Sequence, residues 1–242
     1  RDTMTDQVPQ TRIYRTWNIP SVDSEVTDRM NLVSQVLGGS RSSRLDKRLV
    51  FQDKLADSVA TFAWGSELGG LFIVQVDVKQ GVDPAKVEAA LDEELDKLIA
   101  SGPTEAELAQ AKTVIEAGFV RGIERIGGFG GKADVLAECA VFTGDPACYA
   151  KTLTVIEQSS VKDVQATAAE WLSSGDYTLT VVPGERKAVV EAPAVKDLKP
   201  SVIPPADPKF TTVPSTVNRS LGVPKTDRFP SLEFPFQHRA TL

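Results

Sequence analysis

Histidine is almost absent from this sequence. Only one of its 242 residues is a histidine, and this residue, His238, lies close to the C-terminus. Catalytic zinc sites commonly use two or three imidazole ligands, and a serine or cysteine nucleophile commonly relies on a histidine base. We therefore predict that this chain contains no catalytic residue and no metal-binding residue.

Long hydrophobic runs and an excess of basic charge are absent as well. No apolar run reaches the roughly 20 residues that a membrane-spanning helix needs, and the formal net charge is −6 at pH 7. Nucleic acids and anionic membranes attract proteins that carry basic patches. We therefore expect neither nucleic acid nor a membrane among the partners of this protein.

Cysteine is scarce, since the sequence has only Cys139 and Cys148. A disulfide between them is possible if both side chains face inward, but two thiols do not form a disulfide framework. The segment around them offers too few further ligands for a zinc site. The interpretation that we favour is a pair of reduced, partly buried cysteines.

What the sequence does contain is a clear succession of amphipathic segments. Alternating apolar and polar residues predict four strands, at 11–19, 55–64, 71–78 and 176–182. Apolar spacings of three and four predict seven helical segments, at 24–37, 43–52, 84–100, 104–126, 133–142, 147–157 and 160–172. Because strands and single helices do not alternate, we predict an α+β fold of two layers, with a mostly antiparallel sheet and helices on one face.

Two glycine clusters interrupt the predicted helices. Gly38 and Gly39 should end the first helix by adopting the left-handed conformation that glycine reaches without a Cβ clash. The second cluster, at 127–131, precedes Lys132 and superficially suggests a phosphate-binding loop. It lacks the Gly-x-x-x-x-Gly-Lys-Ser/Thr spacing and follows a helix instead of a strand, so we interpret it as a helix interruption.

Composition divides the chain into three parts. Residues 1–10 are polar and are predicted to form a loose lead-in, and residues 11–187 contain the predicted α+β domain. Nine of the fifteen prolines lie in residues 188–242, which predicts an extended linker. Because polar sequence follows Arg1 directly and the C-terminal residues resemble the start of a further domain, we expect the chain to be a segment of a longer protein.

The most specific pattern is VLGGSRSSRLDKRLV, followed by KLADSVATF, within residues 35–62. It resembles the non-catalytic second domain in the first half of pitrilysin/insulinase-type zinc metallopeptidases, a family that includes mitochondrial processing peptidase. The likeness extends over about residues 10–184. It implies a parent chain that is a zinc-dependent endopeptidase acting on peptides or small proteins.

The family's catalytic features do not match this chain. Its His-x-x-Glu-His motif would need histidines that the predicted domain lacks. A second feature, an arginine seven residues before a tyrosine, is also missing, because Asp57 stands at the tyrosine position and Val50 at the arginine position, with Arg48 out of register. The resemblance therefore implies that this chain needs no cofactor and that zinc is held by a preceding domain of the parent chain.

Carried over position by position, the resemblance implies a peptide-binding surface at Gly38, Gly39, Ala63, Trp64 and Gly65. An unpaired strand edge would bind an extended peptide through backbone hydrogen bonds. The alternative is that both glycines only end a helix and that Trp64 packs in the core. The expected partners are a zinc-bearing domain before this one, a second half after it, and the peptide substrate.

Two other functions remain open from the sequence. The parent could be a proteolytically inactive homologue with a scaffold role, as the core subunits of respiratory complex III are in this family. It could also pair with a separate catalytic subunit. The family alone favours the periplasm or envelope of a bacterium as the location.

Overall fold

The computed structural model describes residues 1–173 and 175–186, together with five single positions, 205, 216, 218, 220 and 222. Apart from these five positions, the proline-rich linker predicted over 188–242 lies outside the described residues, and so does His238. The described strands and helices belong to one compact unit that starts at Arg1.

One five-stranded sheet forms the centre of the fold. Its strands are β1 (Asp2–Asp6), β2 (Arg12–Ile19), β3 (Ala56–Gly65), β4 (Gly70–Val78) and β5 (Tyr177–Pro183). They lie in the order β1-β5-β2-β4-β3. Only the β1–β5 pair is parallel, whereas the other three pairs are antiparallel. The predicted mostly antiparallel sheet is therefore confirmed.

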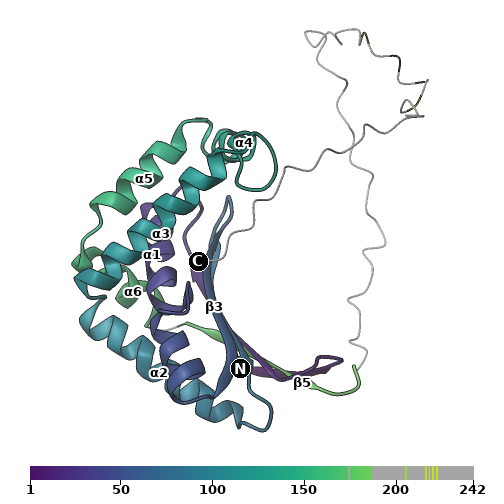
Figure 1. The fold of residues 1–242 in the computed structure, drawn as a ribbon, viewed down its shortest axis with the longest axis vertical. Coiled ribbons are helices and arrows are strands. Elements are labelled where there is room, and N and C mark those ends of the chain that lie inside the picture. The colour runs from purple at the N-terminus through teal and green to yellow at the C-terminus, as the bar shows by residue number, and fades with distance from the viewer. Residues whose placement is uncertain are drawn as a thin grey trace, which may run out of the picture. The chain divides into compact units, whose positions relative to one another are not determined.

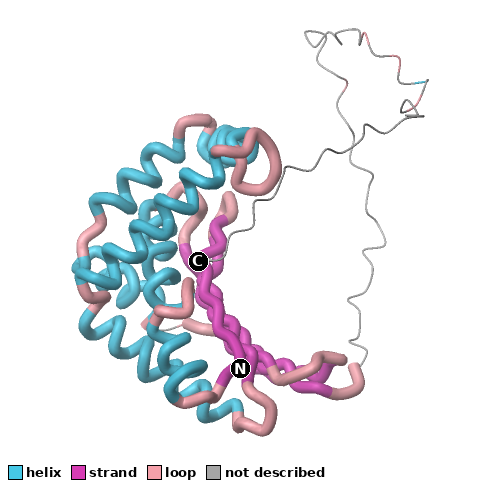
Figure 2. Tube along the Cα trace, viewed as in Figure 1, coloured by secondary structure: helices cyan, strands magenta, loops and turns pink. Residues whose placement is uncertain are grey.

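Six α-helices and one π-helical turn form the second layer. They are α1 (Glu25–Gly38), η1 (Asp46–Gln52), α2 (Pro84–Ser101), α3 (Glu105–Ile123), α4 (Lys132–Thr143), α5 (Cys148–Gln158) and α6 (Val161–Leu172). Figures 1 and 2 show the helices on one side of the curved sheet. The predicted two-layer α+β fold is confirmed, and no described helix has both the length and the hydrophobicity of a membrane span.

The core lies between these two layers, and local sequence explains which side chains enter it. On β4, Phe72, Val74, Val76 and Val78 point toward the helices and are almost completely buried. The opposite face of β4 is only partly covered. On α2, the apolar residues spaced by four, four and three, Val87, Leu91, Leu95 and Leu98, are buried in the same core. Burial of such periodic stripes is the main contribution that favours this packing.

Helix starts follow standard capping chemistry. Ser24 accepts a hydrogen bond from the Val26 N–H at the start of α1, and Asp83 accepts one from the Ala85 N–H at the start of α2. At α3, Thr104 and Glu107 form the reciprocal capping box that their spacing predicts. These caps satisfy N–H groups that have no partner within the helix.

The prediction for residues 1–10 was wrong. Residues Asp2–Asp6 form β1 instead of a loose lead-in, and they pair in parallel with β5, from Asp2 beside Leu179 to Asp6 beside Pro183. The strand is polar because it lies at a sheet edge where no side chain is fully buried. Its partner is more than 170 positions away, so no local pattern reveals the pairing. The helix predicted at 43–52 also differs, because its main part is the π-helical turn η1.

Candidate functional site

Strand β3 forms one edge of the sheet, because β4 is its only neighbour in the strand order. Two backbone hydrogen bonds fix which residues point away from β4. The Val78 N–H donates to the Thr11 carbonyl on the β2 side, and the Lys79 N–H donates to the Leu55 carbonyl on the β3 side. Since successive residues of a strand direct their backbone groups to opposite sides, the odd-numbered residues of β4 face β3.

The strand register extends this alternation to β3. Phe62 is paired with Ile73, and Trp64 with Leu71, so Phe62 and Trp64 direct their backbone groups toward β4. Thr61 and Ala63 therefore direct theirs toward the free edge. Neither makes a backbone hydrogen bond to another turn or loop among the described residues. The free edge of β3 thus offers donors and acceptors to an additional strand.

The predicted site residues divide into two groups. Ala63, Trp64 and Gly65 lie together at the end of β3 and line one cavity. Gly38 and Gly39 lie at the C-terminal end of α1 and do not line it. The Trp64 side chain is 63% exposed, so the alternative of Trp64 in the core is wrong.

Both glycine predictions for the end of α1 need a correction. Gly39 has φ −80° and ψ −9°, and Gly38 is not among the residues with positive φ. Neither therefore uses the left-handed conformation. Gly38 is required for close packing, because a Cβ there would lie 2.8 Å from Thr61 Cγ2 and 3.3 Å from the Thr61 backbone nitrogen. Gly38 thus brings α1 against the middle of β3.

Gly65 has a similar packing role at the other end of β3. A Cβ on this residue would lie 2.8 Å from the Cα of Val22, in the segment that leads into α1. The Val22 N–H also donates to the Ser66 carbonyl at 3.0 Å. These contacts hold the end of the edge strand beside the start of α1, where the cavity opens.

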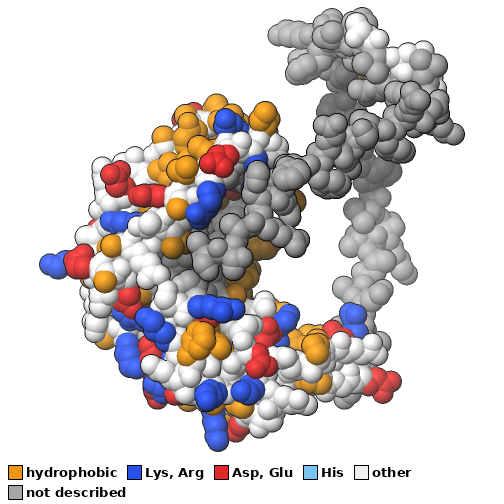
Figure 3. Space-filling view, viewed as in Figure 1, with side chains coloured by type: hydrophobic (Ala, Val, Ile, Leu, Met, Phe, Trp, Pro, Cys, Tyr) orange, Lys and Arg blue, Asp and Glu red, His pale blue; other side chains and the backbone are white. Residues whose placement is uncertain are grey.

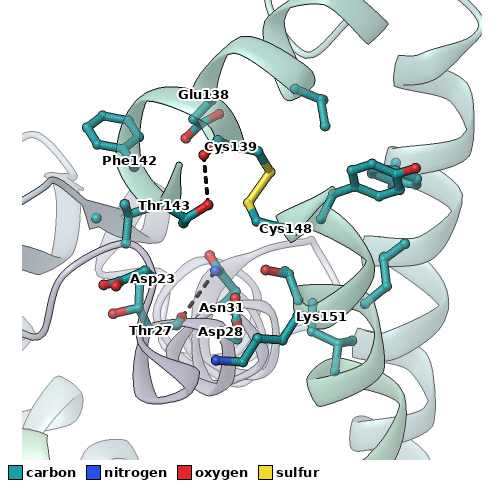
Figure 4. A pocket seen from close by; sticks show the side chains of 18 of the residues that line it. Asp23, Thr27, Asp28, Asn31, Glu138, Cys139, Phe142, Thr143, Cys148 and Lys151 are labelled. Atoms are coloured by element: carbon teal, nitrogen blue, oxygen red, sulfur yellow. Dashed lines mark hydrogen bonds between the residues drawn. A yellow bond between two sulfur atoms is a disulfide. The ribbon is translucent and has the colours of Figure 1, made fainter. Parts of the chain in front are cut away.

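The cavity beside this end of β3 has a volume of about 700 Å³. Its walls come from the start of α1, the end of β3, and the helices α3, α4 and α5. Figure 4 shows Asp28 and Asn31 of α1 facing Lys151 of α5, with Cys139 and Cys148 at the opposite wall. Figure 3 shows hydrophobic side chains gathered over the end of the domain where α4 lies. On α4 and in the segment before it, Ile126, Phe129 and Val141 are strongly exposed.

Asp28 is the most unusual polar residue of this cavity. It is only 6% exposed, yet it makes no ion pair with another described residue. Burial raises the pKa of the Asp28 carboxyl to about 6, although a hydrogen bond with Thr152 and the nearby charge of Lys151 act in the opposite direction. Sequence analysis missed Asp28 because an acidic residue in the first turn of a helix is ordinary.

A disulfide joins the two helices that form the outer wall of the cavity. Cys139 of α4 and Cys148 of α5 are bonded, with their Cα atoms 5.3 Å apart. The prediction of reduced cysteines is therefore wrong. The turn after α4, which ends at Gly144 in the left-handed conformation, folds α5 back beside α4 and brings the two thiols together.

Comparisons with known proteins agree with this architecture. The family model described as the peptidase M16 inactive domain matches residues 2–115. This match covers 114 of the 242 residues, and these residues are similar to the peptidase M16 inactive-domain family. The pitrilysin/insulinase-type assignment that the glycine motif predicts is confirmed. A comparison with curated protein sequences found no match.

Solved structures show the same fold over a longer stretch than the M16 family match. A protease from Helicobacter pylori matches with a TM-score of 0.66 and 19% identity, over 75% of this chain and 44% of its own. An inactive peptidase domain from Bordetella parapertussis matches with a TM-score of 0.65 and 21% identity, over 78% of this chain and 98% of its own. The periplasmic protease PqqL from Escherichia coli matches with a TM-score of 0.58 and 15% identity, over 76% of this chain and 21% of its own.

The M16 domain does not provide a metal centre in the part that the structure describes. No group of three or more histidine, cysteine, aspartate or glutamate side chains there could hold a metal ion. Both cysteines are bonded to each other in the disulfide. A disulfide sulfur is not the thiolate ligand that zinc prefers. These residues therefore do not fit zinc.

Proposed function

We propose that this M16 domain is the non-catalytic part of a zinc-dependent endopeptidase and that it forms one wall of the peptide-binding chamber. The zinc belongs to a separate domain, before this one in the parent chain. A second half of the parent follows. This domain packs against the zinc-bearing domain and orients an extended peptide for cleavage there.

The free edge of β3 carries this proposal. Thr61 and Ala63 direct outward backbone groups that no other described residue pairs with, and the same edge ends at the 700 Å³ cavity. An extended peptide that adds to such an edge gains main-chain hydrogen bonds, each worth about 1 kcal/mol net. Because these bonds involve only the peptide backbone, the surface accepts peptides of many sequences.

Gly38 and Gly65 support the edge through close packing with neighbouring elements. Each lets part of the α1 region approach β3 more closely than a residue with a Cβ would allow. The Thr61 hydroxyl also donates to the Ser34 carbonyl of α1 at 2.6 Å. A strand held this firmly is ready to accept a peptide without reorganising, which reduces the entropic cost of binding.

The disulfide supports a location outside the cytoplasm, such as the periplasm of a bacterium. Disulfides persist in oxidising compartments and are rare where thioredoxin and glutathione keep thiols reduced. PqqL, which has the same fold, is a periplasmic protease. A peptidase in that compartment would meet extended and unfolded peptides, which suit an open strand edge.

Backbone methylation of a peptide tests the proposed strand addition. The probe is a labelled, threonine-rich peptide of eight residues, and binding to the full 242-residue chain is followed by fluorescence anisotropy. Methyl groups on every second backbone nitrogen should weaken binding about tenfold or more in one register, because they remove the donors that face β3. The same number of methyl groups in the other register should have little effect.

A protein variant provides the matching control. Ala63→Pro removes an outward N–H without removing a bond to β4, so the variant should fold and bind the peptide more weakly. Equal binding of both methylated peptides, or unchanged binding by folded Ala63→Pro, would show that the peptide does not add to the β3 edge.

A further inference from the structure

We propose that the cavity at the end of β3 is a subsite for one cationic group of the bound peptide, with Asp28 as its counter-ion. The group is the side chain of a lysine or arginine or the ammonium of an N-terminus. This inference rests on the proposed peptide binding and adds a preference that backbone hydrogen bonds alone do not create.

The state of Asp28 is the first argument. Asp28 is 94% buried, and it lines the cavity. A buried carboxylate is costly unless a cation or several hydrogen bonds compensate for the lost hydration. Thr152 and Lys151 both favour the charged form of Asp28, but neither forms an ion pair with it. Asp28 thus has no charged partner among the described residues, and it lines the cavity.

The charges of the cavity wall are the second argument. Four carboxylates line it, those of Asp23, Asp28, Glu138 and Asp145, against the single ammonium of Lys151. Two of the four have local partners. Asp145 accepts a hydrogen bond from the Ala147 N–H at 2.9 Å, and Asp23 accepts one from the Ser21 hydroxyl at 2.5 Å. The remaining negative charge favours a cation inside the cavity.

The apolar part of the wall fits the stem of such a side chain. Phe119 of α3 and Tyr149 of α5 stack with ring centroids 5.7 Å apart, and both line the cavity. Lysine and arginine bury their methylene groups against apolar surface and direct the charged end elsewhere. An aromatic wall with one buried carboxylate is therefore complementary to a long cationic side chain.

The position of the cavity links it to the peptide. Ala63 and Gly65 belong to the odd-numbered residues of β3, whose backbone groups face the free edge, and both line the cavity. A peptide strand added at this edge has alternate side chains on one face. One of them would then reach the cavity, while its neighbours along the peptide would not.

A position scan with arginine and citrulline tests the subsite. The probes are eight-residue, threonine-rich peptides with an acetylated N-terminus and one arginine, moved along the sequence. Each has a partner in which uncharged citrulline, of nearly the same shape, replaces the arginine. With the full chain, we expect one position at which the arginine peptide binds about tenfold more tightly, as a single desolvated charge pair produces. A second set with a free N-terminus identifies an ammonium as the bound group.

Three variants connect this preference to Asp28. Asp28→Asn keeps the shape and should reduce the preference to less than about twofold. Asp96→Asn, which changes an exposed carboxylate of α2 outside the cavity, should leave it intact. Lys151→Met retains Asp28 and should increase the preference, since it removes the competing ammonium. Thermal melting of each variant verifies that it is folded.

The outcomes separate the two proposals. Binding of all peptides with no difference between arginine and citrulline, at any position or with either terminus, overturns the subsite and leaves strand addition in place. A preference that survives in folded Asp28→Asn also overturns it. If no peptide binds, the proposed function fails, and the subsite fails with it.

Discussion

Gly38 lies where α1 comes closest to the edge strand of the sheet. Thr61 occupies the space that a side chain at position 38 would need. The Thr61 methyl group would lie 2.8 Å from a Cβ at that position. Thr61 cannot easily move, because it is buried and donates its hydroxyl hydrogen to Ser34. The sequence motif therefore marks a contact between two elements, beyond the end of one helix.

Gly38→Ala should destabilise the domain by about 1 to 3 kcal/mol, the usual cost of forcing extra volume into a packed site. Gly118→Ala is the matched control. Gly118 lies in α3, and a Cβ there would meet no heavy atom within 4 Å, so this change should stabilise the helix by about 0.5 to 1 kcal/mol. Urea unfolding of both variants measures the difference. Equal effects would contradict the packing role of Gly38.

Glu107 illustrates how one side chain can have two structural tasks. It closes the capping box of α3 with Thr104, and it accepts hydrogen bonds from Arg44 Nε at 2.8 Å and Nη2 at 2.7 Å. Arg44 also donates to the Gly102 carbonyl. The arginine thus joins the serine-rich turn after α1 to the junction between α2 and α3. The pairing with Arg44 is the main reason that the pKa of Glu107 is lowered to about 2.

This pair should make stability depend on pH in the acid range. The pKa of Glu107 is about 2 in the folded state, below its ordinary value of 4.5. Its contribution is therefore complete above pH 4.5 and is lost as the pH falls toward 2. Glu107→Gln should cost about 1 to 2 kcal/mol at pH 7, because solvent screens this partly exposed pair, and less at pH 2.5. Glu105→Gln is the control in chemical denaturation, because Glu105 lies in the same first turn but forms no ion pair with another described residue.

At the scale of elements, α4 is the least securely packed helix of the domain. Among its residues only Cys139 is fully buried, and the disulfide joins it to α5. The glycine cluster before α4 provides little further support, since a Cβ at Gly127 or Gly128 would meet nothing within 4 Å. The position of α4, and thus of one wall of the cavity, depends largely on this covalent link.

Removal of the disulfide should loosen α4 without unfolding the sheet. In the double variant Cys139→Ser and Cys148→Ser, amide hydrogen exchange should accelerate in α4 and in the turn after it. Exchange in β4 should stay slow. The closed loop is short, so the lost stabilisation is about 2 to 3 kcal/mol in the chain-entropy description. Equal acceleration throughout the domain would instead mean that the disulfide supports the whole fold.

Element prediction from sequence succeeded where burial is periodic. The stripe of α2 and the alternation of β4 are strong patterns because each has one buried face, and both segments form the predicted structure. The prediction failed at β1, whose polar residues take their conformation from β5. For Trp64 the sequence left two possibilities open, because hydrophobicity alone does not tell a core tryptophan from one that is exposed beside a cavity.

At the scale of the whole molecule, the strand order determines which strand lies at the edge where we propose that a peptide binds. β3 and β4 are adjacent in sequence and in the sheet, but β2 and β5 come from opposite ends of the domain. This arrangement leaves β3 at one edge and puts the helices on one face (Figure 1). The cavity lies at the end of that edge, and its walls include residues of α1, α3, α4 and α5.

The sequence by itself determined the two-layer α+β class, most of the elements and the M16 family, because periodic hydrophobicity, capping residues and a glycine motif are local signals. Only the tertiary structure decided that β1 pairs with β5, that Cys139 and Cys148 are bonded, and that Asp28 is buried at a cavity. The strand pair and the surroundings of Asp28 depend on residues brought together from distant parts of the chain, and the disulfide depends on how the turn after α4 places α5. Such contacts are set by the packing of whole elements, and a single sequence does not record which elements will meet.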